Sequence, residues 1–260
     1  MSNPIRFSVF TKPWKMPIPE LAAYVHALGF DGIELPVRPG YPIEPECVAQ
    51  LPQAARQLAE EGVQIESVAA PTDEATIAAC SEAGVPIIRT MVHIGPEGYM
   101  ASVAQAQRTF DALLPQLERS GVRIGVQNHC DRCVSNAMGL RHFLERYDPR
   151  QVCAVWDAAH NALNGEDPEL ALEIIWPFLG MVNLKNAIWE RTVGPEAEVA
   201  EWRHYWTDGR HGLASWPRVA AELRRRGYEG VVCLTAEYSA GDAVDRLVRE
   251  DLAFAESLLA

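Results

Sequence analysis

Short apolar segments recur along this chain, and most of them follow directly after a glycine. Six polar-rich stretches end in glycine immediately before such a segment, at Gly29, Gly62, Gly84, Gly121, Gly180 and Gly227. Glycine just past a helix end readily takes the left-handed backbone conformation that other residues resist. An apolar run of about four to eight residues after it is typical of a buried parallel strand. The pattern therefore predicts helices that alternate with buried strands.

Eight strands are predicted in total. Six follow the glycines, and the other two are Ile5–Thr11 and Val152–Asp157. The stretches between the strands carry apolar residues at helical spacing, and the last of these helices covers Ala243–Leu259. Eight such units in 260 residues indicate an α/β protein, a (β/α)₈ TIM barrel formed as a single domain over residues 1–260.

A doubly wound open sheet is the rival architecture. That fold usually has a glycine-rich phosphate-binding turn after its first strand. Here the turn is Thr11–Lys15, which contains no glycine. The barrel is therefore favoured, and no linker or charge block divides the chain.

One connection, residues 189–214, is longer than a barrel loop needs to be. Structureless loops of more than about 12–15 residues are uncommon in compact domains and are often functional. The segment is rich in Trp, Arg and His, and residues 196–206 are compatible with an inserted helix. We expect either a lid over the active site or a contact between subunits of a homo-oligomer.

The composition excludes several classes of partner. The net charge of -12 disfavours nucleic acid and anionic membrane surfaces, because phosphate contacts need an excess of Lys and Arg. No apolar run is long enough to span a membrane, and the first ten residues do not resemble an export signal. Six cysteines in 260 residues are too few for a disulfide scaffold. These features together predict a cytoplasmic protein.

Polar residues cluster where the predicted strands end. Alternate side chains of a barrel strand point into the barrel, and barrel enzymes act at the carboxyl ends of the strands. Each residue alone can be an ordinary hydrogen-bonded side chain, and Arg89 can be an ion-pair partner of Glu34 or Glu66. The whole set nevertheless predicts one site, formed by Glu34, Arg89, His93, Gln127, His129, Asp157, His160, Asn183, Lys185 and Glu237.

Several segments carry a resemblance to a known family. The chain resembles the xylose isomerase-like TIM-barrel superfamily, and within it the sugar phosphate isomerases and epimerases. The resemblance covers essentially the whole chain in strand order. It rests on DGIEL (31–35), MVH (91–93), QNH (127–129), WDAAH (156–160), NLKNA (183–187) and TAEY (235–238).

The resemblance implies a divalent metal, Mn²⁺ or Mg²⁺, held by residues of strands five to eight. Asp157 and Glu237 match the ligands of strands six and eight, and His160 matches a substrate-contacting histidine. Gln127 stands where the family has Glu, and Asn183 stands where it usually has His. The metal ligands expected here are thus Asp157, Glu237, Gln127 and Asn183, an all-oxygen set.

The implied activity is proton transfer next to the carbonyl of a small carbohydrate, as in isomerisation, epimerisation or dehydration. Glu237 and His160 are the expected proton-transfer residues, and Lys185 or the metal would stabilise the oxyanion. The alternative is a sugar-binding or noncatalytic barrel subunit that has lost its metal site. A repair nuclease of the same superfamily is disfavoured by the net charge.

Other residues are expected at the edge of the site. Substrate contacts are predicted for Trp14, Glu34, His93, His129, Arg191 and His211. Trp14 can instead be a packing residue. The CxxC pair Cys130 and Cys133 is interpreted as structural thiols, because a single CxxC without a second pair is a weak signal for zinc or redox chemistry.

Overall fold

The structure is a computed structural model, and it describes residues 5–259. Eight strands of this region form a parallel barrel, closed in the order β1-β10-β7-β6-β5-β4-β3-β2. The predicted TIM barrel is confirmed. Its strands are β1 (Arg6–Phe10), β2 (Gly32–Pro36), β3 (Gln64–Ala69), β4 (Ile87–Thr90), β5 (Arg123–Gln127), β6 (Val152–Asp157), β7 (Leu179–Leu184) and β10 (Val231–Leu234).

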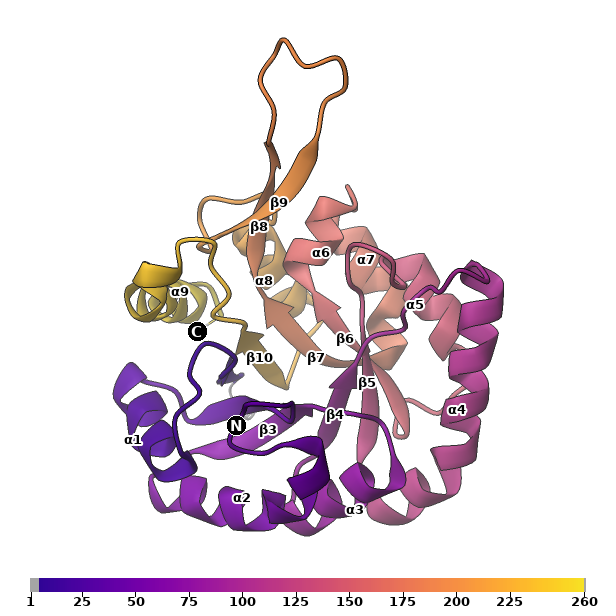
Figure 1. The fold of residues 1–260 in the computed structure, drawn as a ribbon, viewed down its shortest axis with the longest axis vertical. Coiled ribbons are helices and arrows are strands. Elements are labelled where there is room, and N and C mark those ends of the chain that lie inside the picture. Colours follow the sequence, from indigo (N-terminus) through magenta and orange to yellow (C-terminus); the bar gives the residue numbers. More distant parts are fainter. Residues whose placement is uncertain (1–4, 260) are drawn as a thin grey trace.

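The helices surround this barrel (Figure 1). The α-helices are α1 (Ile18–Leu28), α2 (Leu51–Glu60), α3 (Glu74–Ala83), α4 (Tyr99–Ser120), α5 (Ala137–Leu144), α6 (Ala158–Leu163), α7 (Pro168–Ile175), α8 (Trp216–Arg225) and α9 (Val244–Leu259). Short 3₁₀ turns are η1 (Pro45–Gln50), η2 (Trp176–Phe178) and η3 (Gly241–Ala243). None of the helices described for residues 5–259 has the length and apolar character needed to cross a membrane.

The apolar core has two parts. The larger part lies between the strands and the surrounding helices. The smaller part fills the barrel interior and consists of Phe10, Ala69, Ile87, Val155, Met181, Val231 and Cys233. Since side chains alternate along each strand, residues two positions further along β4, β6 and β7 also point inward. These are the polar residues Arg89, Asp157 and Asn183. A layer of buried polar side chains therefore lies directly above the apolar interior of the barrel, toward the carboxyl ends of the strands.

Glycine conformations confirm most of the predicted helix ends. The backbone has φ between 67° and 99° at Gly29, Gly62, Gly84, Gly121 and Gly227. The prediction for Gly180 was wrong, because Gly180 lies within β7 and not at a helix end. A Cβ atom there would lie 2.5 Å from the Cys153 sulfur, so this glycine permits close packing against β6.

The long connection after β7 is a β-hairpin. Its strands β8 (Asn186–Arg191) and β9 (Trp202–Thr207) pair antiparallel, with Asn186 opposite Thr207 and Arg191 opposite Trp202. The helix expected over residues 196–206 is therefore wrong. Trp202, His204 and Trp206, which stand at every second position as is typical of a strand, were the missed signal. Figure 1 shows the hairpin projecting well beyond the barrel. Its role in a subunit contact stays a prediction.

Asp251 of α9 joins two loops at the carboxyl end of the barrel. Its Oδ1 accepts a hydrogen bond from the Gly209 amide at 2.8 Å, and its Oδ2 accepts one from the Tyr238 hydroxyl at 2.8 Å. Tyr238 directly follows Glu237. The side chain of Asp251 thus helps to fix the segment that carries Glu237, at the cost of burying a carboxyl group.

Asp251 should lower the stability of the folded protein as the pH rises. Burial raises its pKa from 3.8 to about 6, so the folded state holds this proton more tightly than the unfolded chain. The resulting stabilisation is complete below the unfolded pKa and is lost as the pH passes through the folded pKa. Asp251→Asn keeps an acceptor for Gly209 but has no proton to lose. We expect its unfolding free energy, relative to that of the wild type, to rise by about 2–3 kcal/mol as the pH goes from about 4 to about 7.

Urea unfolding of both proteins at about pH 4 and about pH 7 measures this change in unfolding free energy. Asp242→Asn, which removes an exposed carboxyl from the neighbouring turn, is the matched control and should leave the pH dependence unchanged. An Asp251→Asn variant whose stability follows the wild-type pH profile would contradict the assignment.

Candidate functional site

Most of the predicted site residues lie together at the carboxyl end of the barrel. Glu34, Gln127, Asp157, Asn183 and Lys185 are each at most 5% exposed, although all are polar. Asn183 is in register with Asp157 on β6 and with Cys233 on β10. Such a layer of buried polar groups is costly unless the groups satisfy one another or bind a ligand.

Glu237 lies between two lysines. Its Oε1 pairs with Lys12, which follows β1, and its Oε2 accepts a hydrogen bond from Lys185 Nζ at 2.6 Å. Burial alone would raise the pKa of Glu237, but the charges of Lys185 and Lys12 outweigh it and lower that pKa to about 2. Glu237 is therefore a carboxylate held by two ammonium groups.

Sequence reasoning missed Lys12, although a signal was present. The chain has only three lysines against twenty arginines, at Lys12, Lys15 and Lys185. Two of the three contact Glu237. A lysine carries a compact charge and exchanges its proton more readily than arginine does. The rarity of lysine in this arginine-rich chain was therefore the signal for Lys12.

The backbone before Glu237 is strained. Ala236 has φ of 50°, in the left-handed region that disfavours residues with a Cβ atom. Such a conformation costs about 1–3 kcal/mol and is typical of functional sites. It turns the chain at the end of β10, where Glu237 lies.

Gln127 connects Arg89 to Asp157. Arg89 donates to Glu34 and to Gln127 Oε1, and Gln127 Nε2 donates to Asp157 Oδ2 at 2.8 Å. The other oxygen of Asp157 accepts from the backbone amides of Ala159 and His160 at 3.0 and 3.1 Å. An amide can both accept from Arg89 and donate to a carboxylate, whereas an ionised glutamate can only accept. This explains why glutamine, and not glutamate, suits position 127.

Two side chains at the mouth have buried polar atoms without partners. Cys130 N donates to His160 Nδ1 at 3.2 Å, so the proton of the neutral imidazole lies on Nε2. Burial and the charge of Lys185 lower the pKa of His160 well below its usual value, which keeps the ring neutral. Among the described residues, His160 Nε2 and both amide atoms of Asn183 have no hydrogen-bond partner. They are free to bind a ligand.

Aromatic rings cover this part of the mouth. The His129 and His160 rings stack with centroids 3.9 Å apart, and burial lowers the pKa of His129. Trp206 of β9 meets the His160 ring edge-on at 5.4 Å, and Lys185 Nζ lies 3.4 Å from the centre of the indole. The hairpin therefore places one indole over the site, which supports the lid interpretation for its inner end.

Four predicted substrate contacts lie apart from this centre. Trp14 packs edge-on against Tyr24 at 5.5 Å and donates to Asp245 at 3.1 Å, within the helix layer. His93 is exposed and lies 3.3 Å from the Cys133 sulfur. Arg191 and His211 are exposed, and His211 pairs with Asp208 at 2.7 Å. Within residues 5–259, none of these four forms a hydrogen bond or an ion pair with Glu237, Asp157 or His160.

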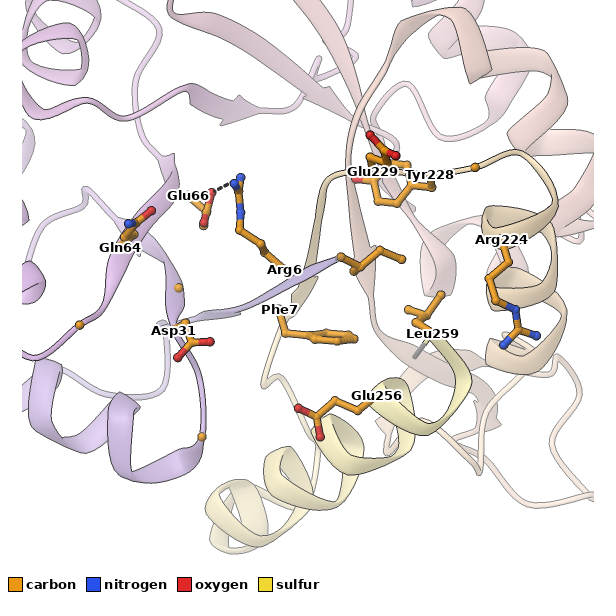
Figure 2. A pocket seen from close by; sticks show the side chains of 15 residues that line it. Arg6, Phe7, Asp31, Gln64, Glu66, Arg224, Tyr228, Glu229, Glu256 and Leu259 are labelled. Atoms are coloured by element: carbon orange, nitrogen blue, oxygen red, sulfur yellow. Dashed lines mark hydrogen bonds and ion pairs between the residues drawn. The ribbon is translucent and has the colours of Figure 1, made fainter. Parts of the chain in front are cut away.

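A large cavity lies at the opposite end of the barrel. It has a volume of about 840 Å³, and its lining includes Arg6, Glu66, Arg224 and Glu256. Figure 2 shows these side chains and the Arg6–Glu66 ion pair of 2.9 Å. The charged pair occupies the amino-terminal ends of β1 and β3, away from the polar layer. The buried unpartnered atoms of His160 and Asn183 lie at the other end.

Comparison with known proteins agrees with the fold. Residues 22–258 match the family model described as xylose isomerase-like TIM barrel. The chain belongs to this family. A comparison with curated proteins finds no match.

Solved structures of similar fold include two sugar epimerases and a dehydratase. The 3-keto-D-glucoside 4-epimerase of E. coli has a TM-score of 0.75 at 14% identity, covering 97% of this chain and 99% of that one. D-psicose 3-epimerase of Clostridium cellulolyticum has a TM-score of 0.72 at 13% identity, covering 98% and 99%. The probable 3-DHS dehydratase of Bacillus anthracis has a TM-score of 0.70 at 12% identity, covering 96% and 98%. At these identities the likeness shows the fold.

The divalent metal that the resemblance implied does not fit the expected ligands of this xylose isomerase-like chain. Both oxygens of Glu237 are held by ammonium groups, and Gln127 Oε1 is held by Arg89. Both oxygens of Asp157 already accept hydrogen bonds. Only the amide of Asn183 is free. Lysine, arginine and amide donors thus occupy most of the ligand atoms that a cation would need.

A different group of metal-ligand side chains lies beside His160. His129, Cys130 and His160 each offer a ligand atom, and these atoms lie within 4.8 Å of one another. Cys130 forms a second such group with Asp131 and His204. Burial raises the pKa of the Cys130 thiol to about 12, whereas metal ligation needs the thiolate. This is a candidate metal-binding cluster, distinct from the strand-end set.

Removing the two lysines should open the strand-end set to a metal ion. We expect Lys12→Met with Lys185→Met to raise the affinity for Mn²⁺ by about tenfold or more, because both oxygens of Glu237 are then free. Calorimetric titration of chelator-treated protein with Mn²⁺ measures the change. Adding Gln127→Glu and Asn183→His to this double variant should strengthen Mn²⁺ binding further. The same two changes should strengthen it much less in a protein that keeps Lys12 and Lys185.

Lys15→Met is the matched control, since Lys15 lies over the Tyr41 ring at 4.7 Å, and the ion pairs of Glu237 in the described part of the chain are with Lys12 and Lys185. It should bind Mn²⁺ as the wild type does. Unchanged affinity in the double variant would show that the lysines do not keep a cation out.

Proposed function

We propose that this protein is an enzyme that moves a proton next to the carbonyl group of a small sugar or related polyhydroxy compound, as an isomerase or epimerase does. The observation that carries the proposal is the Glu237 carboxylate between Lys12 and Lys185, in a mouth where His160 Nε2 and the Asn183 amide have no partner. The epimerase and dehydratase names of similar structures support this reaction class.

Lys185 is assigned to stabilising the oxyanion that develops on the substrate. Proton removal beside a carbonyl produces an enediolate, and a fixed cation at its oxygen lowers the barrier. The ammonium of Lys185 is buried and fixed between Glu237 and the Trp206 ring. A substrate oxygen that accepts a hydrogen bond from this ammonium needs no metal ion for its stabilisation.

Glu237 is assigned to proton abstraction. A carboxylate with a pKa of about 2 is a weak base as long as both lysines contact it. A substrate oxygen that draws Lys185 toward itself weakens this contact, and the pKa of Glu237 then rises. Glu237 therefore becomes a stronger base only when a substrate is bound. Without substrate, its low pKa keeps the carboxylate unprotonated.

His160 is assigned to proton donation, the counterpart of proton abstraction by Glu237. Its neutral ring presents the Nε2 proton, so it can donate a hydrogen bond or a proton to a substrate hydroxyl. Asp157 Oδ2 lies 4.0 Å from His160 Nε2, and burial raises the pKa of Asp157 despite the charge of Lys185. Asp157 and His160 together offer a second proton path that does not use Glu237.

The substituted ligands at positions 127 and 183 favour a second candidate, a sugar-binding barrel without catalysis. Glu237→Gln distinguishes the two candidates. We expect this variant to lose solvent proton exchange at the substrate α-carbon by about 100-fold or more, because an amide cannot accept the proton. Exchange is followed by proton NMR in heavy water, over a panel of neutral ketoses, ketose phosphates and keto acids.

Glu229→Gln, which changes an exposed glutamate at the opposite end of the barrel, is the matched control and should keep full exchange. Sugar binding by the wild type without exchange from any member of the panel would support the noncatalytic candidate. Full exchange in Glu237→Gln would remove Glu237 from the mechanism.

The pH profile should report the contact between Lys12 and Glu237. Because the two lysines lower the pKa of Glu237, its protonation should not limit kcat/KM above about pH 4 in the wild type. Lys12→Met removes one of these charges and raises that pKa, so an acid limb should move upward toward the ordinary value of 4.5. Lys15→Met should leave the profile unchanged, and an unmoved limb in Lys12→Met would contradict the role of Lys12.

A further inference from the structure

A small basic cavity lies beside the proposed site. It has a volume of about 240 Å³ and lies between the segments that follow β2, β3 and β4. Its lining contains Arg38, Arg89 and His93, together with apolar residues and Thr90, and no Asp or Glu. The chain as a whole has a net charge of -12. A cavity lined by cationic groups is therefore an exception on this protein.

A tight turn holds Arg38 at this cavity. The Tyr41 amide donates to the Arg38 carbonyl at 3.2 Å, with Pro39 and Gly40 between them. Gly40 has φ of 77°, as the third residue of a type II turn requires. The Tyr41 hydroxyl also donates to the Lys12 carbonyl at 3.0 Å. The same turn thus fixes Arg38 and the backbone of the lysine that contacts Glu237.

Arg38 differs from Arg89 in having no acidic partner. Arg89 is paired with Glu34, whereas no Asp or Glu within residues 5–259 lies in ion-pair distance of the Arg38 guanidinium. Both guanidinium groups lie over the Phe10 ring, at 4.8 Å for Arg89 and 5.6 Å for Arg38. Burial and the charge of Arg89 lower the pKa of Arg38, and the more distant carboxylates of Glu34 and Glu237 only partly oppose this shift. A half-buried cation beside another cation is stabilised by an anion that pairs with it.

We propose that Arg38 binds an anionic group of the substrate, a carboxylate or a phosphate ester, in this cavity. The proposal rests on the proposed function, since it assigns the substrate class of the same mouth. The planar guanidinium can hold either group through two parallel hydrogen bonds. The substrate would then extend from its anionic end at Arg38 to its reacting carbonyl at Lys185 and Glu237.

Anion binding tests the cavity without any turnover. Wild-type protein is titrated calorimetrically with inorganic phosphate and, separately, with malonate at constant ionic strength. We expect binding of at least one anion, a loss of about tenfold or more in Arg38→Gln, and partial retention in Arg38→Lys. Arg119→Gln, the same change at an exposed position of α4, should bind as the wild type does. Equal binding by Arg38→Gln and the wild type, or no binding of either anion, would overturn the proposal.

Preference between the two probes identifies the anion. Tighter phosphate binding indicates a sugar phosphate, and tighter malonate binding indicates a sugar acid or keto acid. With the preferred class as substrate in the exchange assay, Arg38→Gln should raise KM by about tenfold and change kcat less, because Arg38 lies away from the reacting atoms. A fall in kcat with unchanged KM would contradict a binding role.

The two proposals fail in different ways. Exchange with neutral ketoses that Arg38→Gln leaves unchanged would overturn the anion site and leave the proposed reaction in place. Anion binding that depends on Arg38, without exchange from any carbonyl substrate, would keep the anion site and overturn the proposed reaction.

Discussion

The ion-paired group of Lys12, Glu237 and Lys185 is the interaction around which the mouth of this barrel is organised. Glu237 follows a strained Ala236 at the end of β10, Lys12 follows β1, and Lys185 follows β7. These three strands are neighbours in the closed barrel. Burying charges is costly unless each has a partner, and removing one partner leaves an uncompensated charge. The three side chains therefore depend on one another and on the closure of the barrel.

The second buried network keeps its charges apart from the first. Arg89 is neutralised by Glu34, and the amide of Gln127 links that pair to Asp157 without adding charge. A glutamate at position 127 would place a second carboxylate against Asp157, as a metal site requires. The amide instead completes the hydrogen bonds of a site whose cations are side chains. The chain itself thus supplies positive charge at this end of the barrel, through Lys12, Lys185 and Arg89.

The hairpin of β8 and β9 closes the site on one side. Trp206 covers both the His160 ring and the Lys185 ammonium, which reduces their contact with water. Electrostatic interactions are stronger where water is excluded. The outer part of the hairpin exposes Trp189 and Trp202, at 43% and 59%, and takes no part in these contacts. The same element therefore combines a covering inner end with an apolar outer surface.

The amino-acid sequence by itself determined the barrel and the strand ends that carry polar residues. Both follow from local rules: glycine tolerates the left-handed helix end, and side chains alternate along a strand. These rules identified Glu34, Asp157, Lys185 and Glu237. They misassigned Gly180, whose role is close contact between β6 and β7, because such contact depends on a partner distant in sequence.

Only the tertiary structure decided which of these side chains act together. The Lys12–Glu237 pair joins residues 225 positions apart, and Arg89 reaches Glu34 over 55 positions. Trp206 reaches the mouth because it pairs with Ala187 at the base of the hairpin, close to Lys185. Trp14, Arg191 and His211 have suitable chemistry, but their local surroundings direct them elsewhere. Residue type and strand parity limit which groups can meet, whereas the closure of the barrel and its long connections determine which groups do.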